Sequence, residues 1–141
     1  MKEIKIFIVE DDSIFINIFS DLIDAIQKEY DDEKINVKLN IKTFYSVKEA
    51  SFELRQNPEI IIMDYYLTDD NLKPMTSDKL LEDIKSSGKD VKVIAVTGED
   101  DPDIVDSLKE KGASFYISKS PKTFYRIKPT LKLLIDKIIE D

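Results

Sequence analysis

The chain has 141 residues, of which 42% are hydrophobic and 35% charged, and this composition suits one globular domain rather than a disordered or collagen-like chain. Its formal net charge of -8 argues against nonspecific binding to nucleic acid or to an anionic membrane, and no apolar run approaches the roughly 20 residues that cross a bilayer. The absence of Cys and His excludes disulfides, thiolate and imidazole metal sites, and Ser–His catalytic pairs, and we expect a cytoplasmic protein.

In chain order, the apolar patterning of the first half predicts a strand at 4–9 and a helix from 13 to the charged stretch 28–34. It then predicts a strand at 37–44, a helix at 46–56 and a strand at 59–64. Ser13 is a candidate cap for the first helix, and Ser46 with Glu49 has the spacing of a capping box. The strand at 59–64 is the most apolar in the chain, and it ends on Asp64.

The pattern of the second half predicts a polar loop at 65–76, a helix at 77–87 and a strand at 91–96. It then predicts a helix at 102–112, a short strand at 115–118 and a last helix from about 121 onward. Gly88 is typical of a helix end, and Pro102 suits a first helical turn. Pro129 falls in the first turns of the last helix, so we expect an irregular start there.

Strands therefore alternate with helices five times. The continuous apolar strands predict an α/β fold in which helices cover both faces of a five-stranded parallel sheet, a doubly wound (βα)5 sandwich. The chain contains no internal repeat and no linker-like stretch, so residues 1–141 are predicted to form a single domain.

Polar side chains follow four of the predicted strands, namely Glu10, Asp11 and Asp12 after the first, Asp64 at the third, Thr97 at the fourth and Lys119 at the fifth. Any one of them alone would more often be a helix cap or an exposed side chain. Ligands of open α/β sheets bind at the carboxyl ends of the strands, where these residues converge. Clustered carboxylates repel one another, and Mg²⁺ (or Mn²⁺) with a phosphate group relieves that repulsion. The pattern predicts a divalent-cation site that also binds phosphate.

Four segments carry a resemblance to a known family: Val9-Glu10-Asp11-Asp12, Ile61-Ile62-Met63-Asp64, Ala95-Val96-Thr97-Gly98 and Gly112-Ala113-Ser114-Phe115-Tyr116-Ile117-Ser118-Lys119. They resemble the receiver domain of bacterial two-component response regulators, including the single-domain chemotaxis receivers. The resemblance extends from residue 2 to about residue 139. It implies a flavodoxin-like fold with strand order 2-1-3-4-5.

The resemblance also implies a metal site. By this similarity, Asp64 would be both the phosphoacceptor and a metal ligand, Asp11 would be a direct ligand, and Glu10 would act through water. The backbone carbonyl of Tyr66 would be a further ligand. Asp12 matches a variable position of the family and is placed outside the site.

Three more residues match functional positions of the family. The resemblance implies that Thr97 and Lys119 bind the phosphoryl oxygens, and that Thr97 and Tyr116 form the switch pair. Phosphorylation would then reshape a docking face. The partners implied are a sensor histidine kinase or a histidine phosphocarrier protein, and a downstream target protein. The protein would not be a turnover enzyme, although it would catalyse its own phosphorylation and its slow dephosphorylation.

Two alternatives compete with this hypothesis. A receiver-like module could bind partners without being phosphorylated, but all five family residues are in place. A dehalogenase-type phosphatase needs a second acid two residues after its nucleophile, where this chain has Tyr66.

The chain departs from the family pattern at several points. The loop at 65–76 is about five residues longer than usual by our alignment, and its Asp69 and Asp70 are expected to be solvated. Ser77 replaces a family Gly, and Ser120 follows Lys119 where the family has Pro after a cis bond, which leaves the geometry of that peptide open. Tyr66 and Glu99 flank the predicted phosphoryl site and are expected to influence the phosphoryl lifetime.

Overall fold

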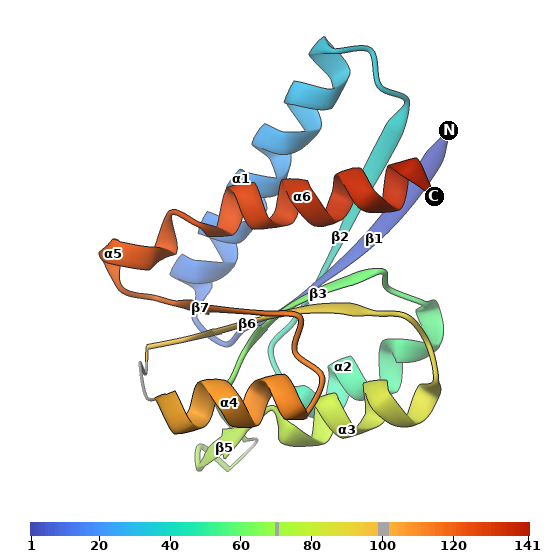
Figure 1. Cartoon of the computed structure of the whole chain (residues 1–141). Coiled ribbons are helices and arrows are strands. Elements are labelled where there is room, and N and C mark those ends of the chain that lie inside the picture. Colours follow the sequence, from blue (N-terminus) through green and yellow to red (C-terminus); the bar gives the residue numbers. More distant parts are fainter. Residues whose placement is uncertain (70, 99–101) are drawn as a thin grey trace.

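The computed structural model describes residues 1–69, 71–98 and 102–141 (Figure 1). In chain order its elements are β1 (Lys2–Val9), α1 (Ser13–Asp32), β2 (Val37–Phe44), α2 (Val47–Glu53), the 3-10 turn η1 (Leu54–Gln56), β3 (Ile60–Asp64), β4 (Tyr66–Thr68), β5 (Pro74–Thr76), α3 (Asp78–Ser87), β6 (Lys92–Thr97), α4 (Pro102–Glu110), β7 (Phe115–Ser118), α5 (Pro121–Phe124) and α6 (Ile127–Glu140). Five strands form one sheet in the order β2-β1-β3-β6-β7, and each neighbouring pair is parallel. The predicted flavodoxin-like α/β fold, with its strand order, is confirmed.

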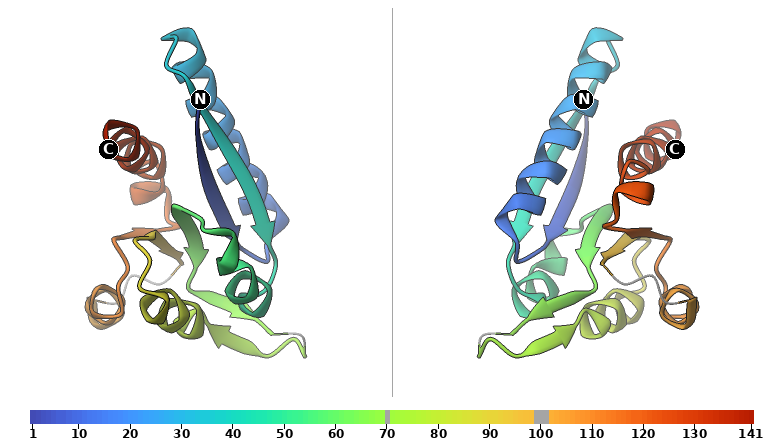
Figure 2. Two further views of the ribbon diagram at one scale, coloured as in Figure 1. Left: turned by 90° about the vertical axis from the view of Figure 1, so that its right-hand side faces the viewer. Right: turned by 90° about the vertical axis from the view of Figure 1, so that its left-hand side faces the viewer.

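Helices cover the sheet on both sides, which explains why its central strands are apolar on both faces. The pair α1 and α6 lies on one side, and α2, α3 and α4 lie on the other (Figures 1 and 2). Alternate residues of a strand point to opposite faces, and β1 divides accordingly. Ile4, Ile6 and Ile8 belong to the core beneath α1 and α6, whereas Phe7 and Val9 belong to the core beneath α2, α3 and α4.

The first helix begins as predicted but has a different cap. The Asp12 side chain, not Ser13, accepts the backbone N–H of Ile14 at 2.9 Å, and Ser13 is the first helical residue. Asp12 has an extended backbone, from which its carboxylate reaches the N–H two residues along. The helix ends at Asp32, within the predicted charged stretch.

The second helix also begins as predicted, because the Ser46 hydroxyl accepts the backbone N–H of Glu49 at 3.2 Å. Its predicted extent, residues 46–56, is divided between α2 and η1. The left-handed backbone of Asn57 then ends the helical path.

The segment 65–76, which the sequence predicted to be a polar loop, contains two short paired strands. The strands β4 and β5 pair antiparallel as a hairpin, with Tyr66 opposite Thr76 and Thr68 opposite Pro74. The Asp69 carboxylate accepts the backbone N–H groups of Asn71 and Lys73, at 2.9 and 2.8 Å, and so organises the turn. The polar residues of this segment show no strand pattern in the sequence, so the hairpin was not predicted. It projects from the body of the molecule (Figure 2). Asp70 lies outside the described residues.

The irregular start of the last helix is confirmed. The chain makes the short helix α5, turns at Tyr125 and Arg126, and continues as α6. Pro129 is the third residue of α6, where its missing N–H removes no intrahelical hydrogen bond. Over the described ranges, none of the helices is both long and apolar enough to span a membrane.

Candidate functional site

The parallel register brings four strand ends to one edge of the sheet. Val9 of β1 lies opposite Met63 of β3, Asp64 lies opposite Val96 of β6, and Thr97 lies opposite Ser118 of β7. The residues that follow these strands therefore converge at this edge, as the sequence predicted. We define the carboxylate site as Glu10, Asp11, Asp64 and Lys119.

Lys119 is the centre of the buried contacts in this site. Its Nζ donates to Glu10 Oε1 at 2.6 Å and to Asp64 Oδ2 at 3.0 Å. The Glu10 side chain is fully buried, and those of Asp64 and Lys119 are 7% and 15% exposed. The same ammonium lies over the ring of Phe15 in α1, 4.1 Å from its centroid. Two acids and one base are thus held together with little access to water.

Burial and the mutual contacts of these groups shift the pKa values of Glu10 and Lys119. Burial raises the pKa of Glu10 to about 8, and the neighbouring Asp64 carboxylate adds to this shift, while Lys119 opposes it. Burial alone would lower the pKa of Lys119, but its hydrogen bond to Glu10 and the charge of Asp64 raise that pKa above its usual value. Lys119 is therefore a cation at neutral pH, whereas Glu10 holds its proton more readily than a free glutamate does.

Asp11 completes a group that fits a divalent cation. One carboxylate oxygen from each of Glu10, Asp11 and Asp64 can be chosen so that all lie within 4.8 Å of one another. Unlike the other two acids, Asp11 is exposed to solvent. An all-oxygen donor set with an open side suits a hard cation such as Mg²⁺, which keeps several waters when bound.

The backbone around Asp64 is fixed by contacts that the sequence did not predict. The hydroxyl of Ser77, which is fully buried, donates to the Asp64 carbonyl at 2.5 Å, and the Ser77 N–H donates to the Tyr65 carbonyl at 2.9 Å. The Tyr65 N–H donates to Val96 in β6 at 2.9 Å. Ser77 was visible in the sequence, but its hydrogen bond to a residue 13 positions earlier was not.

Asp64 opens onto a surface pocket of about 410 Å³ lined by Asp64, Tyr66, Thr97, Gly98 and Lys119. Thr97 is fully buried, and its carbonyl accepts the backbone N–H of Lys119 at 2.8 Å. Tyr66, 39% exposed, lies at the rim, and its N–H donates to Asp64 Oδ1 at 3.3 Å. The structure thus groups four of the predicted functional residues around one opening.

Tyr116, the other predicted switch residue, lies apart from this pocket lining. It is half-buried in β7 and packs against the core beneath α2, α3 and α4. No peptide bond between described residues is cis, so the bond between Lys119 and Ser120 is trans. Glu99 lies outside the described residues.

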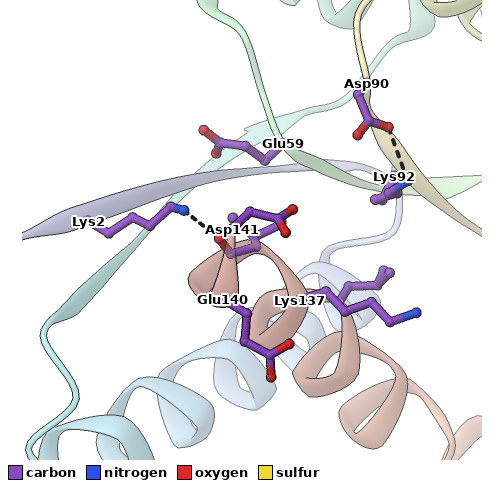
Figure 3. Close-up of a pocket in the computed structure, with 9 residues that line it drawn as sticks. Lys2, Glu59, Asp90, Lys92, Lys137, Glu140 and Asp141 are labelled. Carbon is purple, nitrogen blue, oxygen red and sulfur yellow. Dashed lines mark hydrogen bonds and ion pairs between the residues drawn. The ribbon is translucent and has the colours of Figure 1, made fainter.

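A different pocket of about 390 Å³ lies at the opposite end of the sheet (Figure 3). Its lining contains both lysines and acids, and two of its three lysines, Lys2 and Lys92, already have partners. Lys92 pairs with Asp90 at 3.0 Å, and the Lys2 ammonium donates to the carbonyl of Ile138. Among the described residues, the group of acids that could hold a metal ion is Glu10, Asp11 and Asp64, so the carboxylate site remains the candidate functional site.

Comparisons with known proteins show the family to which the chain is similar. A family model described as the response regulator receiver domain matches residues 6–124. A signal receiver domain from Vibrio parahaemolyticus is 22% identical with a TM-score of 0.74, over 96% of this chain and 92% of that one. The receiver domain of a DNA-binding response regulator from Colwellia psychrerythraea 34H is 24% identical with a TM-score of 0.73, over 94% and 98%. The chemotaxis protein CheY4 of Vibrio cholerae is 17% identical with a TM-score of 0.69, over 94% and 98%. None of the curated protein sequences matches the chain.

Proposed function

The chain belongs to the response regulator receiver domain family, and from this membership we propose that Asp64 accepts a phosphoryl group from a phosphohistidine in a reaction that needs Mg²⁺ or Mn²⁺. The donor would be a sensor histidine kinase or a histidine phosphocarrier protein, which places the reaction in the cytoplasm. In this proposal residues 1–141 form one receiver domain. The observation that carries it is the contact of one lysine with two buried acids, 3.0 Å from Asp64 and 2.6 Å from Glu10, beside an open pocket.

The proposed reaction is an in-line displacement at phosphorus. An Asp64 carboxylate oxygen bonds to phosphorus as the phosphorus–nitrogen bond of the phosphohistidine breaks, and the leaving imidazole keeps the electron pair and takes up a proton. Lys119 would pair with the phosphoryl oxygens, and its hydrogen bond to Asp64 Oδ2 supports this role. Such catalysis is mostly positioning and electrostatic stabilisation.

The proposed metal ligands are Asp11, Asp64 and the backbone carbonyl of Tyr66, with Glu10 acting through water. When bound, the cation supplies positive charge that offsets the charge on the phosphoryl oxygens. Bound there, the cation would also reduce the repulsion among Glu10, Asp11 and Asp64 and so favour their ionised forms.

The proposed switch uses the residues beside the pocket. Thr97 would donate its hydroxyl to a phosphoryl oxygen, and Tyr116 would move into the space that Thr97 leaves. Tyr116 packs against the same core as Leu108 of α4, so its movement would reshape the surface formed by α4, β7 and α6. A downstream target protein would dock there, as phosphorylation shifts an existing equilibrium between two states.

The test is phosphorylation in vitro, read by intact mass. With Mg²⁺ and acetyl phosphate, the protein is expected to gain one phosphoryl group. Asp64→Asn, or the parent protein without Mg²⁺, is expected to gain none. Asp21→Asn, which changes an exposed acid on α1, serves as the matched control and should react like the parent.

A short-lived adduct could escape this assay, so beryllofluoride, a stable phosphoryl mimic, provides a second arm. We expect a Mg²⁺-dependent change in the amide spectrum around β6, α4 and β7. Failure of both arms would overturn the proposed reaction and leave a receiver-shaped module that binds partners without phosphorylation.

A further inference from the structure

The hairpin of β4 and β5 reaches the carboxylate site through one residue. Thr68, at the end of β4, donates both its backbone N–H and its hydroxyl to Asp11 Oδ2, each at 3.1 Å. These residues are 57 positions apart in the chain. The segment that makes the loop after Asp64 unusually long therefore also holds an acid of the site.

The two bonds leave Asp11 a free oxygen. Both end on Oδ2, so Oδ1 remains available to a cation. Within residues 1–69, 71–98 and 102–141, Thr68 is the only residue that donates to the Asp11 carboxylate. Asp11 is exposed, and an exposed aspartate would otherwise exchange among several rotamers. Because two donors hold Oδ2, the direction in which Oδ1 points is also fixed.

The hairpin is anchored firmly enough to hold Thr68 in place. Leu67, next to Thr68, is 4% exposed and belongs to the core beneath α2, α3 and α4. At its base, the Ser77 N–H closes onto the Tyr65 carbonyl at 2.9 Å, and at its tip the Asp69 N–H donates to the Lys73 carbonyl at 2.8 Å. Thr68 is thus carried by a paired and partly buried element.

We propose that Thr68 is a positioning residue that orients the Asp11 carboxylate toward a divalent cation shared with Glu10 and Asp64. The inference rests on the proposed function, because it uses the cation that phosphorylation would need. Outer-shell partners of metal-binding carboxylates typically raise metal affinity by about 10- to 100-fold. Thr68 keeps its N–H contact in a hydroxyl-free variant, so its hydroxyl should account for the lower part of that range.

This arrangement also couples the hairpin to the cation. If Thr68 favours the cation-binding orientation of Asp11, then by linkage a bound cation favours the Thr68–Asp11 contact by the same factor. Cation binding should therefore protect the Thr68 amide and its hairpin neighbours from hydrogen exchange. This readout does not depend on phosphorylation.

The first experiment is calorimetric titration with MgCl₂ and with MnCl₂, without a phosphodonor, on the parent protein, Thr68→Val and Thr68→Ser. We expect about 10-fold weaker binding for Thr68→Val and near-parent binding for Thr68→Ser, which keeps the hydroxyl. Thr43→Val makes the same change in β2 and should bind like the parent.

The outcomes separate this inference from the function on which it rests. Equal or tighter cation binding by Thr68→Val would overturn the positioning role while leaving the metal site intact. Absence of binding by the parent would overturn the metal site and, with it, the proposed phosphorylation. If Thr68→Val does not fold, Asp11→Ala provides the reciprocal test, and faster exchange of the Thr68 amide is expected. Unchanged exchange would overturn the contact.

Discussion

The two faces of the sheet are built differently. On one face, α1 and α6 bury a dense row of side chains, namely Ile16, Phe19, Ile23, Ile26 and Tyr30 from α1, and Ile127, Leu131, Leu134 and Ile135 from α6. Polar contacts also join the two helices, with Glu29 bonded to both Lys128 and Lys132. On the other face, α4 buries Leu108 alone among its described residues.

This difference assigns separate roles to the two faces. Lys119 lies on Phe15 of α1, so the well-packed face supports the residue that pairs with both acids. Tyr116 and the hairpin belong to the other face, where α4 is held by few buried groups. Elements with few buried contacts open and move at low free-energy cost. We therefore expect a change at Asp64 to be expressed through α4 rather than through α1 and α6.

The largest expected effects come from a matched pair of core substitutions. Leu131 of α6 and Leu108 of α4 are both fully buried. Leu131→Ala should lower the free energy of unfolding by about 4–5 kcal/mol, because its rigid surroundings cannot close the cavity. Leu108→Ala should lower it by about 2–3 kcal/mol, because α4 can shift toward the sheet. Urea denaturation measures both values.

Hydrogen exchange then sharpens this comparison. In Leu108→Ala, amides of α4 should exchange faster while those of α1 and α6 keep their protection. If the two variants lose equal free energy of unfolding, and exchange rises equally in α4, α1 and α6, the two faces are equally well packed.

Sequence patterns were sufficient to predict the strands of the sheet and the acids at its carboxyl edge. Apolar periodicity located the strands, and parallel strands place their carboxyl ends together, so Glu10, Asp64 and Lys119 meet as the sequence predicted. The cap of α1 was predicted one residue too late, because Asp12 and Ser13 are both good capping residues and only the backbone angles distinguish them.

The contacts of segment 65–76 could not be predicted in this way. Its hairpin depends on a turn organised by the Asp69 carboxylate, and polar turn residues are equally typical of irregular loops. The bond between Thr68 and Asp11 depends on where that hairpin points, which no local pattern encodes. The same is true of Ser77, whose partner is the Asp64 carbonyl.

A second matched pair concerns one buried tyrosine on each face. Tyr30 donates to Asp136 at 2.5 Å, and Tyr65 donates to Asp78 at 2.9 Å. Tyr30→Phe should lower the free energy of unfolding by about 1.5 kcal/mol, because a hydrogen bond to a charged acceptor is lost. Tyr65→Phe should cost about 1 kcal/mol or less, because Lys111 still bonds to Asp78.

Thermal and urea unfolding measure both changes. Tyr45→Phe is the control, because Tyr45 is 60% exposed and its change should stay within about 0.5 kcal/mol. A larger loss for Tyr65→Phe than for Tyr30→Phe would contradict the tighter coupling of α1 to α6.

The smallest expected effect is a pH dependence of the free energy of unfolding, which arises from Asp78 and Lys111 on the α4 face. Burial alone would raise the pKa of Asp78, but hydrogen bonds from Lys111 and Tyr65 outweigh it and hold that pKa below its usual value. Because the folded state then binds the Asp78 proton less well than the unfolded chain does, the contribution to stability is present above the unfolded pKa of 3.8. It is lost as the pH falls through the lower, folded pKa.

Lys111→Met removes the main opposing contact, so the parent protein should be the more stable of the two above about pH 5, and the difference should shrink toward about pH 2. The difference should not exceed about 1 kcal/mol, because the side chains of Lys111 and Asp78 are 40% and 39% exposed and water screens them. Urea unfolding at several pH values measures it, with Lys109→Met, an exposed lysine of α4, as the control. A difference that grows as the pH falls would reverse the sign argued here, and would mean that Lys111 contributes through packing or repulsion rather than through the ionised Asp78.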